Sequence, residues 1–234
     1  MAKIINELSV FFPTYNEEKN ITSVTRKTKK VLQKVAKKWE IVIINDGSQD
    51  KTKEVAEKLS NKDKRIKVIN HEVNQGYGGA LKTGYENARY KWVAFIDSDD
   101  QFDFTEITKF IKHKNNSDLI LGIRKERADP FMRRVYTLVW SRLLPITLFR
   151  LNVKDYSCGF WMIKKEVYDA IRPIISEEKV TKIEMLVKAK RKGYKFAEVK
   201  VNHYPRTAGS QTGADIKVIL RSVRDLIKLW FQLR

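Results

Sequence analysis

The sequence lacks most of the features that mark secreted or membrane-spanning proteins. Cys158 is the only cysteine among 234 residues, which excludes an internal disulfide and is typical of a reducing compartment. No run approaches the ~20 consecutive apolar residues that a transmembrane helix needs. The N-terminus has neither the long apolar core nor the small-residue cleavage site of a signal peptide. We therefore expect a chain without a membrane span, for which any membrane contact is interfacial.

Acidic residues are scarce relative to basic ones. The chain has 28 Asp and Glu against 47 Lys and Arg, which gives a formal net charge of +19. Such a positive surface favours anionic partners, namely nucleic acid, anionic lipid headgroups or phosphorylated substrates. The 42% of hydrophobic residues and 11% of aromatic residues support a packed core and exclude a disordered chain.

Short β-branched apolar runs alternate with helical patterns through the first half of the chain. The runs predict buried strands at Leu8–Phe12, Glu40–Asn45, Ile66–Ile69, Trp92–Ile96 and Asp118–Leu121. The helical patterns cover Glu17–Lys37, Lys51–Ser60, Gly79–Ala88 and Thr105–Lys114. This alternation predicts an α/β fold with a mainly parallel central sheet and helices on both faces. Ligands of such sheets bind at the carboxyl ends of the strands, here the loops after Phe12, Asn45 and Ile96.

The second half of the chain continues this pattern less regularly. Strands are predicted at Gly159–Lys164 and Lys195–Val201, and a helix at Val180–Lys192. The apolar and arginine-rich segment 130–151 contains Pro145, which should kink or break a helix. Segment 215–234 has apolar residues at helical spacing among Lys and Arg, typical of a helix at a bilayer interface or packed on the protein itself. We expect one domain at 1–213 and a C-terminal amphipathic helix at 214–234.

Three carboxylates follow the strand that ends at Ile96. They belong to Asp97, Asp99 and Asp100, and Gln101 adds a neutral oxygen. Carboxylates this close repel one another unless a cation lies among them, and Mg²⁺ and Mn²⁺ prefer oxygen ligands of this kind. Such a metal would neutralise charge on a bound diphosphate. The alternative is an acidic turn that caps the next helix.

Polar loops also follow the neighbouring strands. Residues 45–48, which include Asp46, suit a sharp turn. Asp46 also lies at the end of a strand, where an acidic residue of dinucleotide-binding folds accepts hydrogen bonds from a ribose. Residues 13–18 offer an aromatic ring and an acid at the same edge. The glycine-rich run 74–80 is similar to a phosphate-binding turn, although it matches no phosphate-loop pattern in full.

Taken in order, these loops read Pro-Thr-Tyr-Asn-Glu-Glu, Asn-Asp-Gly-Ser-x-Asp-x-Thr, Asn-x-Gly-x-Gly-x-Ala-Leu-x-x-Gly and Asp-Ser-Asp-Asp-Gln. The set resembles glycosyltransferase family 2, inverting enzymes with the GT-A fold. Four further segments are similar to polyprenyl-phosphate sugar synthases. They are Gly122-Ile-Arg, the segment with Arg133-Arg134, Asp155-Tyr-Ser-Cys-Gly-Phe and the run 203–211. These synthases are relatives of the dolichyl-phosphate mannose and glucose synthases.

The resemblance implies that several loops bind a nucleotide-sugar donor. The implied donor-binding residues are Pro13, Tyr15, Glu17, Asp46, Gly76, Asp97, Arg206 and Ser210. The last two lie in a loop that could close over the diphosphate. A divalent metal, Mg²⁺ or Mn²⁺, would be held by Asp97, Asp99 and Gln101. Two positions depart from the family: Asn45, where many relatives carry Asp, and Asp100, which is commonly apolar and here adds charge beside the metal.

The resemblance also implies a lipid phosphate as the acceptor. Such a phosphate is largely ionised near neutral pH and can attack without a general base, so its site needs cations. Guanidinium groups bind phosphate through two parallel hydrogen bonds, and the candidates are Arg124 and one of the adjacent pair Arg133 and Arg134, between which the sequence does not decide. With Asp97 and Asp99 they form the expected catalytic set. The alternative for the three arginines is an ordinary surface role. Glu184 is an acid that relatives also carry at this place in the helix, and its alternative is a structural salt bridge.

We therefore expect an inverting glycosyltransferase that moves a sugar from a UDP- or GDP-sugar to a polyprenyl or dolichyl phosphate. It would be peripheral on the cytoplasmic face of a membrane, and an apolar helix could also pair two subunits. A saccharide or protein acceptor is the alternative within the family, and it would require a general base; we assign no such role to His203. A basic nucleic-acid-binding protein is the alternative outside it, but no helix-turn-helix or single-strand-binding signature is present. The glycine-rich signature of a sugar nucleotidyltransferase is also absent.

Overall fold

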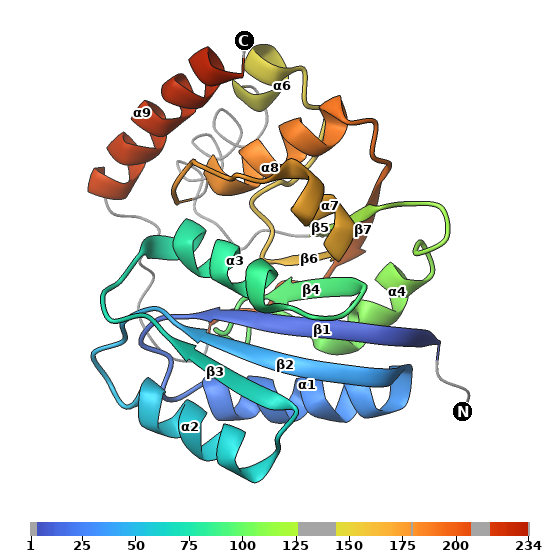
Figure 1. Ribbon diagram of the computed structural model, residues 1–234, viewed down its shortest axis with the longest axis vertical. Coiled ribbons are helices and arrows are strands. Elements are labelled where there is room, and N and C mark those ends of the chain that lie inside the picture. Colours follow the sequence, from blue (N-terminus) through green and yellow to red (C-terminus); the bar gives the residue numbers. More distant parts are fainter. Residues whose placement is uncertain (1–3, 126–143, 179, 207–215, 234) are drawn as a thin grey trace.

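The computed structural model describes residues 4–125, 144–178, 180–206 and 216–233 (Figure 1). Its strands are β1 Ile5–Thr14, β2 Ala36–Asn45, β3 Ile66–Asn70, β4 Trp92–Ile96, β5 Leu119–Arg124, β6 Phe160–Lys164 and β7 Phe196–Val201. Its helices are α1 Ile21–Val35, α2 Thr52–Lys62, α3 Gly76–Asn87, the 3₁₀ turn η1 Phe104–Glu106, α4 Ile107–Ile111, α6 Leu144–Phe149, α7 Lys165–Ile171, α8 Val180–Arg191 and α9 Ile216–Gln232. The predicted α/β fold is confirmed.

The strands form one sheet in the order β3-β2-β1-β4-β6-β5-β7. The pairs β1–β2, β1–β4, β2–β3 and β5–β7 are parallel, so the prediction of a mainly parallel sheet is confirmed. Strand β6 is antiparallel to both neighbours, β4 and β5. Its direction was not predicted, because a strand buried on both faces has the same apolar pattern whichever way it runs.

Helices cover both faces of the sheet, as predicted (Figure 1). On one face, α1, α2 and α4 pack on a core that includes Leu8, Ile41 and Phe110. On the other face, α3, α7, α8 and α9 pack on a second core that includes Phe11 and Trp161. The sheet therefore buries apolar side chains on both sides, as its near-continuous apolar strands require.

Helix α3 begins at Gly76 rather than Gly79, α7 was not predicted at all, and two further helices differ from the sequence prediction. Helix α1 begins at Ile21 rather than Glu17, because the carbonyl of Glu17 accepts the amides of Asn20 and Ile21 in a turn. The expected helix at 105–114 is divided into η1 and α4, with the carboxylate of Asp103 accepting the amide of Thr105 at 2.9 Å. Both differences lie at helix ends, where groups of the preceding loop accept the free amides: a backbone carbonyl before α1 and a side chain before η1.

Helix α9 packs against α8 along one side. Its residues Leu226 and Leu229 are buried in the same core as α8, whereas Ile227 and Phe231 are exposed. Within the described ranges, no helix has the length and apolar character needed to cross a membrane.

Candidate functional site

The loops after β1, β2 and β4 meet at one edge of the sheet, as predicted. The amide of Asp46 donates to the carbonyl of Thr14 at 2.9 Å, and the hydroxyl of Ser98 donates to the carbonyl of Pro13 at 2.9 Å. The amide of Asp97 donates to the carbonyl of Gly159 at 2.9 Å. These bonds join segments far apart in the chain into one polar surface at the carboxyl ends of the strands.

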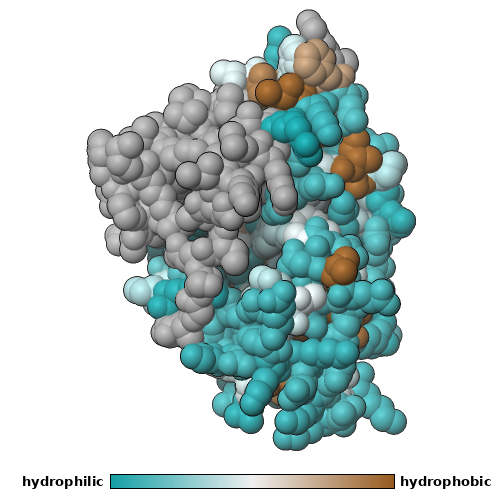
Figure 2. All heavy atoms as spheres, turned by 90° about the vertical axis from the view of Figure 1, so that its left-hand side faces the viewer, coloured by the Kyte–Doolittle hydropathy of each residue, from teal (hydrophilic) through white to brown (hydrophobic). Residues whose placement is uncertain are grey.

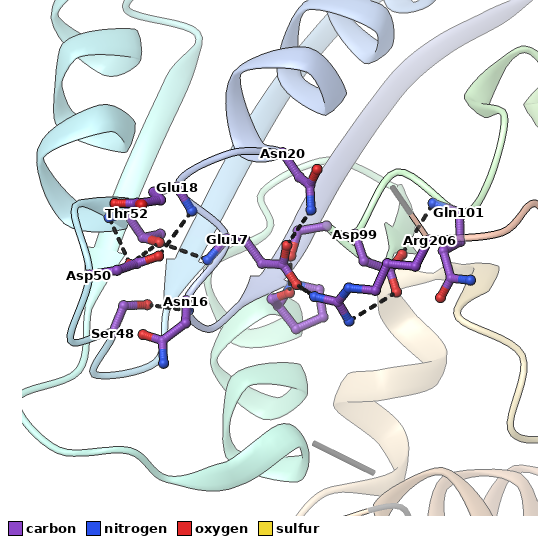
Figure 3. Close-up of polar contacts among 12 residues, drawn as sticks. Asn16, Glu17, Glu18, Asn20, Ser48, Asp50, Thr52, Asp99, Gln101 and Arg206 are labelled. Carbon is purple, nitrogen blue, oxygen red and sulfur yellow. Dashed lines mark hydrogen bonds and ion pairs between the residues drawn. The ribbon is translucent and has the colours of Figure 1, made fainter. Parts of the chain in front are cut away.

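Paired side chains fix the β1 loop against the β2 loop (Figure 3). The amide of Asn16 donates to Ser48 Oγ at 3.0 Å, and Asn16 Oδ1 accepts the amide of Gln49 at 2.8 Å. The amide of Glu17 donates to Thr52 Oγ1 at 2.8 Å. Asn16 has a φ of 54°, a left-handed conformation that asparagine tolerates better than most residues. The neighbouring Tyr15 and Glu17 are therefore carried on a rigid loop.

Asp97 and Asp99 form the acidic centre of this edge. The Tyr77 hydroxyl donates to Asp97 Oδ1 at 2.9 Å, and a Cβ on Gly159 would lie only 1.8 Å from Asp97 Oδ2, so the carboxylate packs directly on this glycine. Burial, with a further contribution from Asp97, raises the pKa of Asp99 from 3.8 to about 7. Two carboxylates shielded from water in this way form a site that a cation would stabilise.

Asp100 does not belong to this centre. It adopts a φ of 60°, and its carboxylate pairs with Lys27 at 2.6 Å and accepts from Ser23 at 3.2 Å, both on α1. The expectation that Asp100 adds charge beside the metal is therefore wrong, because α1 supplies its counter-charge.

The guanidinium of Arg206 lies among the acidic side chains (Figure 3). Its Nη2 donates to Glu17, and its Nη1 is 3.8 Å from Asp99 Oδ2. Burial raises the pKa of Glu17 above its usual value, and the charge of Arg206 opposes that rise. The residues predicted separately to contact a donor thus come together, with Arg206 as the resident cation.

The residues present fit a divalent metal ion. Asp97 and Asp99 supply carboxylate oxygens, and the buried Gln101 donates its Nε2 to the carbonyl of Tyr204 at 2.8 Å, which leaves its Oε1 for a cation. No group of three His, Cys, Asp or Glu residues with metal-binding geometry occurs in the described part of the chain. An ion here would therefore complete its shell with oxygens of water or a bound diphosphate, as Mg²⁺ commonly does.

Asp46 is buried and contacts a histidine that sequence reasoning missed. His71 Nδ1 lies 2.6 Å from Asp46 Oδ1, and His71 Nε2 lies 2.9 Å from Thr83 Oγ1. The amide of Gln75 donates to the same Asp46 oxygen at 2.8 Å. The sequence drew attention to His203 instead, whose ring packs on Phe102 at 5.0 Å. The only available signal for His71 was its position two residues after the predicted strand Ile66–Ile69.

Gly76 approaches the chain segment before α8. It has a φ of 78°, and a Cβ there would lie 2.9 Å from Glu178 Oε1. Its amide donates to Asn74 Oδ1 at 3.0 Å. Gly76 therefore serves a tight turn at the start of α3, and in this structure its amide is bonded within the loop.

Arg124 is held by a neighbouring acid. Its Nε and Nη2 donate to the two carboxylate oxygens of Asp155, each at 2.8 Å, and Nη2 also donates to Ser157 Oγ at 2.6 Å. Burial disfavours its charge, but the bonds to Asp155 raise the pKa of Arg124 above its ordinary value. The described bonds leave Nη1 available. Arg133, Arg134 and Ser210 lie outside the described residues.

Lys182 is a buried lysine beneath this edge that the sequence did not indicate. Its Nζ donates to the carbonyl of Cys158 at 2.9 Å and lies 4.8–5.1 Å from the ring centroids of Tyr77, Phe95 and Trp161. Burial lowers the pKa of Lys182 to about 8, although the negative charge of Asp97 opposes this. The site thus has a cation near each of its two carboxylates, Arg206 near Asp99 and Lys182 near Asp97.

Solved structures share this architecture. Glucosyl-3-phosphoglycerate synthase from Mycobacterium tuberculosis, crystallised with Mn²⁺ and uridine-diphosphate-glucose, has a TM-score of 0.73 to this chain. The likeness covers 97% of this chain and 78% of that one at 19% sequence identity. It establishes the fold as the GT-A arrangement.

Sequence comparison gives the family. The profile of glycosyl transferase family 2 matches residues 9–172. Glycosyltransferase AglD of Haloferax volcanii is 30% identical over 97% of this chain, which spans 37% of that protein. Dolichyl-phosphate β-glucosyltransferase ALG5A of Trichomonas vaginalis is 30% identical over 95% of this chain, which spans 72% of that protein. The chain belongs to glycosyl transferase family 2.

Proposed function

We propose that the protein transfers a sugar, with inversion, from a nucleoside-diphosphate sugar to a polyprenyl phosphate at the cytoplasmic face of a membrane. The donor would bind at the edge formed by Pro13, Tyr15, Glu17 and Asp46. Asp97, Asp99 and Gln101 would hold Mg²⁺ or Mn²⁺, which neutralises charge on the leaving diphosphate. Two relatives support this acceptor class by their names: the ALG5A enzyme and the undecaprenyl-phosphate 4-deoxy-4-formamido-L-arabinose transferase of Pectobacterium atrosepticum, 26% identical over 94% of this chain.

The observation that carries the proposal is the fixed guanidinium of Arg124. Asp155 and Ser157 hold it at the carboxyl end of β5, where its charge interacts with that of Asp97. A preorganised cation that faces an acidic donor site suits an acceptor that is itself an oxyanion. The ionised phosphate needs orientation and charge neutralisation, and no side chain has to remove a proton from it.

Two acidic residues in the described part of the chain that a general base could be sought among, Asp155 and Glu184, are engaged in other contacts. Asp155 is bonded to Arg124, and the buried Glu184 accepts the amides of Ile175 and Ser176 at 3.0 and 2.7 Å. These contacts favour a phosphate acceptor over a saccharide hydroxyl, which would require a base.

In the resting protein, Arg206 occupies the acidic pair formed by Glu17 and Asp99. When a metal and a diphosphate bind, the guanidinium would exchange its carboxylate partners for phosphate oxygens. The metal would then take the place of Arg206 as the cation beside Asp99.

The exposed residues of α9 are consistent with binding to an anionic membrane surface. Arg224 and Lys228 lie beside the exposed Ile227 and Phe231, and the whole chain carries a net charge of +19. Figure 2 shows hydrophobic atoms gathered at the upper end of the face that it views, above a mostly hydrophilic surface. In Figure 1 that end holds α6 and the C-terminus.

The test is sugar transfer from a panel of UDP- and GDP-sugars to a short-chain polyprenyl phosphate, with Mn²⁺ or with EDTA. We expect one lipid-linked sugar that requires the metal. Arg124→Lys should lower kcat/KM about 100-fold, because lysine keeps the charge but loses the fork of donors. Arg65→Lys is the matched control, because Arg65 forms a similar fork with Asp63 at the amino end of β3, with distances of 2.9 and 3.0 Å.

Donor binding without a lipid product would move the acceptor to a saccharide, a protein or a small phosphorylated molecule. Absence of binding to any nucleotide sugar would overturn the proposal.

A further inference from the structure

We propose that His71 and Thr83 are positioning residues of the donor site, which hold the Asp46 carboxylate so that its Oδ2 faces the bound nucleoside. This inference rests on the proposed function. Neither residue is among those that the family resemblance implies. His71 contacts Asp46, and Thr83 contacts His71.

The three side chains form a continuous chain of hydrogen bonds. His71 Nδ1 lies 2.6 Å from Asp46 Oδ1, and His71 Nε2 lies 2.9 Å from Thr83 Oγ1. An ionised carboxylate can only accept, so Nδ1 carries the proton, and Thr83 fixes the other side of the ring. The side chains of His71 and Asp46 are 6% and 4% exposed. A charge-assisted bond shielded from water in this way is short and strong.

The chain connects three elements that form the donor edge. Asp46 follows β2, His71 follows β3, and Thr83 lies in the second turn of α3. The amide of His71 donates to the carbonyl of Asn45 at 2.9 Å, and Asn74 Nδ2 donates to the carbonyl of Asp46 at 3.0 Å. The position of the Asp46 carboxylate is therefore determined by contacts from β2, β3 and the start of α3 together.

These contacts select one oxygen for a ligand. In the described part of the chain, the hydrogen bonds to this carboxylate, from His71 and from Gln75, both end on Oδ1. Oδ2 then has a fixed direction and can accept one N–H of a base or one O–H of a ribose. Since the group is already ordered, binding loses less conformational freedom than it would with a mobile aspartate. Loss of His71 or Thr83 would therefore weaken nucleotide binding, although neither contacts the nucleotide.

A series of variants separates the two links of the chain. His71→Asn keeps an N–H near the position of Nδ1 but cannot reach Thr83. His71→Ala removes both bonds, and Thr83→Val removes only the hydroxyl at nearly constant volume. His113→Ala is the matched control, because His113 is an exposed histidine at the end of α4. The probes are UDP and GDP with Mn²⁺, titrated calorimetrically into the 234-residue protein.

We expect His71→Ala to weaken binding of the accepted nucleotide about tenfold, and Thr83→Val about threefold, with His71→Asn between them. The KM for the donor should rise by the same factors while kcat changes less than about twofold, because the lost interaction acts equally in the ground and transition states. Modified nucleotides distinguish the two possible ligands of Oδ2. If Oδ2 accepts a base N–H, the wild type should bind a nucleotide with an N-methylated base less tightly than the unmodified one. If Oδ2 accepts a ribose O–H, the deoxyribonucleotide should be the one that binds less tightly. In either case the loss of affinity should be smaller in His71→Ala.

The opposing outcomes are distinct. If the variants lower the unfolding temperature but bind nucleotide as tightly as the wild type, His71 and Thr83 only join loops, and the inference is wrong. A fall in kcat at constant KM would also overturn it. If His71→Ala does not fold, Thr83→Val and His71→Asn decide the question. If the wild type binds neither UDP nor GDP, the proposed function fails before the variants are compared.

Discussion

Asp99 is a residue whose ionisation is disfavoured in the metal-free protein. Burial, followed by the charge of Asp97, raises its pKa from 3.8 to about 7. Because the folded pKa lies above the unfolded one, the folded protein binds an extra proton between about pH 4 and pH 7. Its stability therefore falls as the pH rises through this interval. Above pH 7 the ionised Asp99 costs free energy, which a bound cation offsets because it binds only the folded state.

Replacement of Asp99 by asparagine should therefore stabilise the metal-free protein. At pH 8 we expect Asp99→Asn to raise the unfolding temperature by at least about 2–4 °C, equivalent to about 1 kcal/mol, with a clearly smaller rise at pH 5, where only part of the destabilisation has developed. Addition of Mn²⁺ should stabilise the wild type and not the variant. Thermal unfolding from pH 5 to pH 8, with and without Mn²⁺, measures both effects.

The neighbouring Asp100 provides the control for this experiment. Since it pairs with Lys27, Asp100→Asn should keep the Mn²⁺ response and show no such stabilisation at pH 8. An equal shift for Asp99→Asn at pH 5 and at pH 8 would contradict a role for its ionisation.

At the scale of elements, Glu184 connects α8 to the segment before it. The fully buried carboxylate accepts the amides of Ile175 and Ser176 and pairs with Lys188 at 2.5 Å. The sequence left open whether this acid is functional or forms a structural salt bridge, and these contacts favour the structural role. The fixed segment includes Glu178, which packs on Gly76 at the start of α3. Glu184 thus stabilises one wall of the site from a distance.

Glu184→Gln should lower the free energy of unfolding by about 3 kcal/mol, because an amide replaces an acceptor that faces several donors and Lys188 loses its carboxylate partner. Urea unfolding measures this as a lower midpoint at unchanged slope. Asp169→Asn, which removes an exposed i,i+4 pair with Lys165, should change it by less than about 0.5 kcal/mol. Normal stability with lost sugar transfer would instead identify Glu184 as catalytic.

The elements themselves were largely predictable because local patterns determine them. The helical spacing of apolar residues predicted the buried face of α1, which includes Ile21, Val24 and Leu32. Continuous apolar runs predicted strands such as β4. The start of α1 was placed too early, because the turn at Glu17 is held by its backbone carbonyl and by a distant contact with Thr52, which periodicity does not encode. The direction of β6 was not readable, since both of its faces are buried.

The site was predictable only as far as sheet topology positions it. The carboxyl ends of parallel strands coincide, so Asp46, Asp97 and Asp99 could be assigned to one edge. The partners of these residues were not predictable. Arg206 reaches Glu17 across 189 positions of sequence, and His71 reaches Asp46 across 25, so neither contact leaves a local pattern.

At the scale of the whole molecule, the proposed membrane contact combines a general charge with a local apolar face. The net charge of +19 draws the protein toward any anionic surface, but it does not orient the molecule. Orientation would come from α9, which buries Leu226 and Leu229 against the protein and exposes Ile227 and Phe231. Insertion of these two side chains would place the helix in the interface plane.

The two contributions can be separated by vesicle sedimentation. We expect the protein to bind phosphatidylcholine vesicles that contain phosphatidylserine, less strongly at high salt, and weakly to vesicles without the anionic lipid. The double variant Ile227→Ser, Phe231→Ser should lower the partition coefficient at least about tenfold at every salt concentration, because it removes apolar area. Lys228→Gln should lower it about fivefold, and only at low salt, because one lysine contributes about 1 kcal/mol to an unscreened surface interaction.

Ile4→Ser is the control, since Ile4 is also exposed but lies before β1. Equal losses for the control and the double variant would show that exposed apolar residues act without regard to position. Absence of binding to anionic vesicles at low salt would exclude α9 as a membrane contact and leave its exposed face for a protein partner.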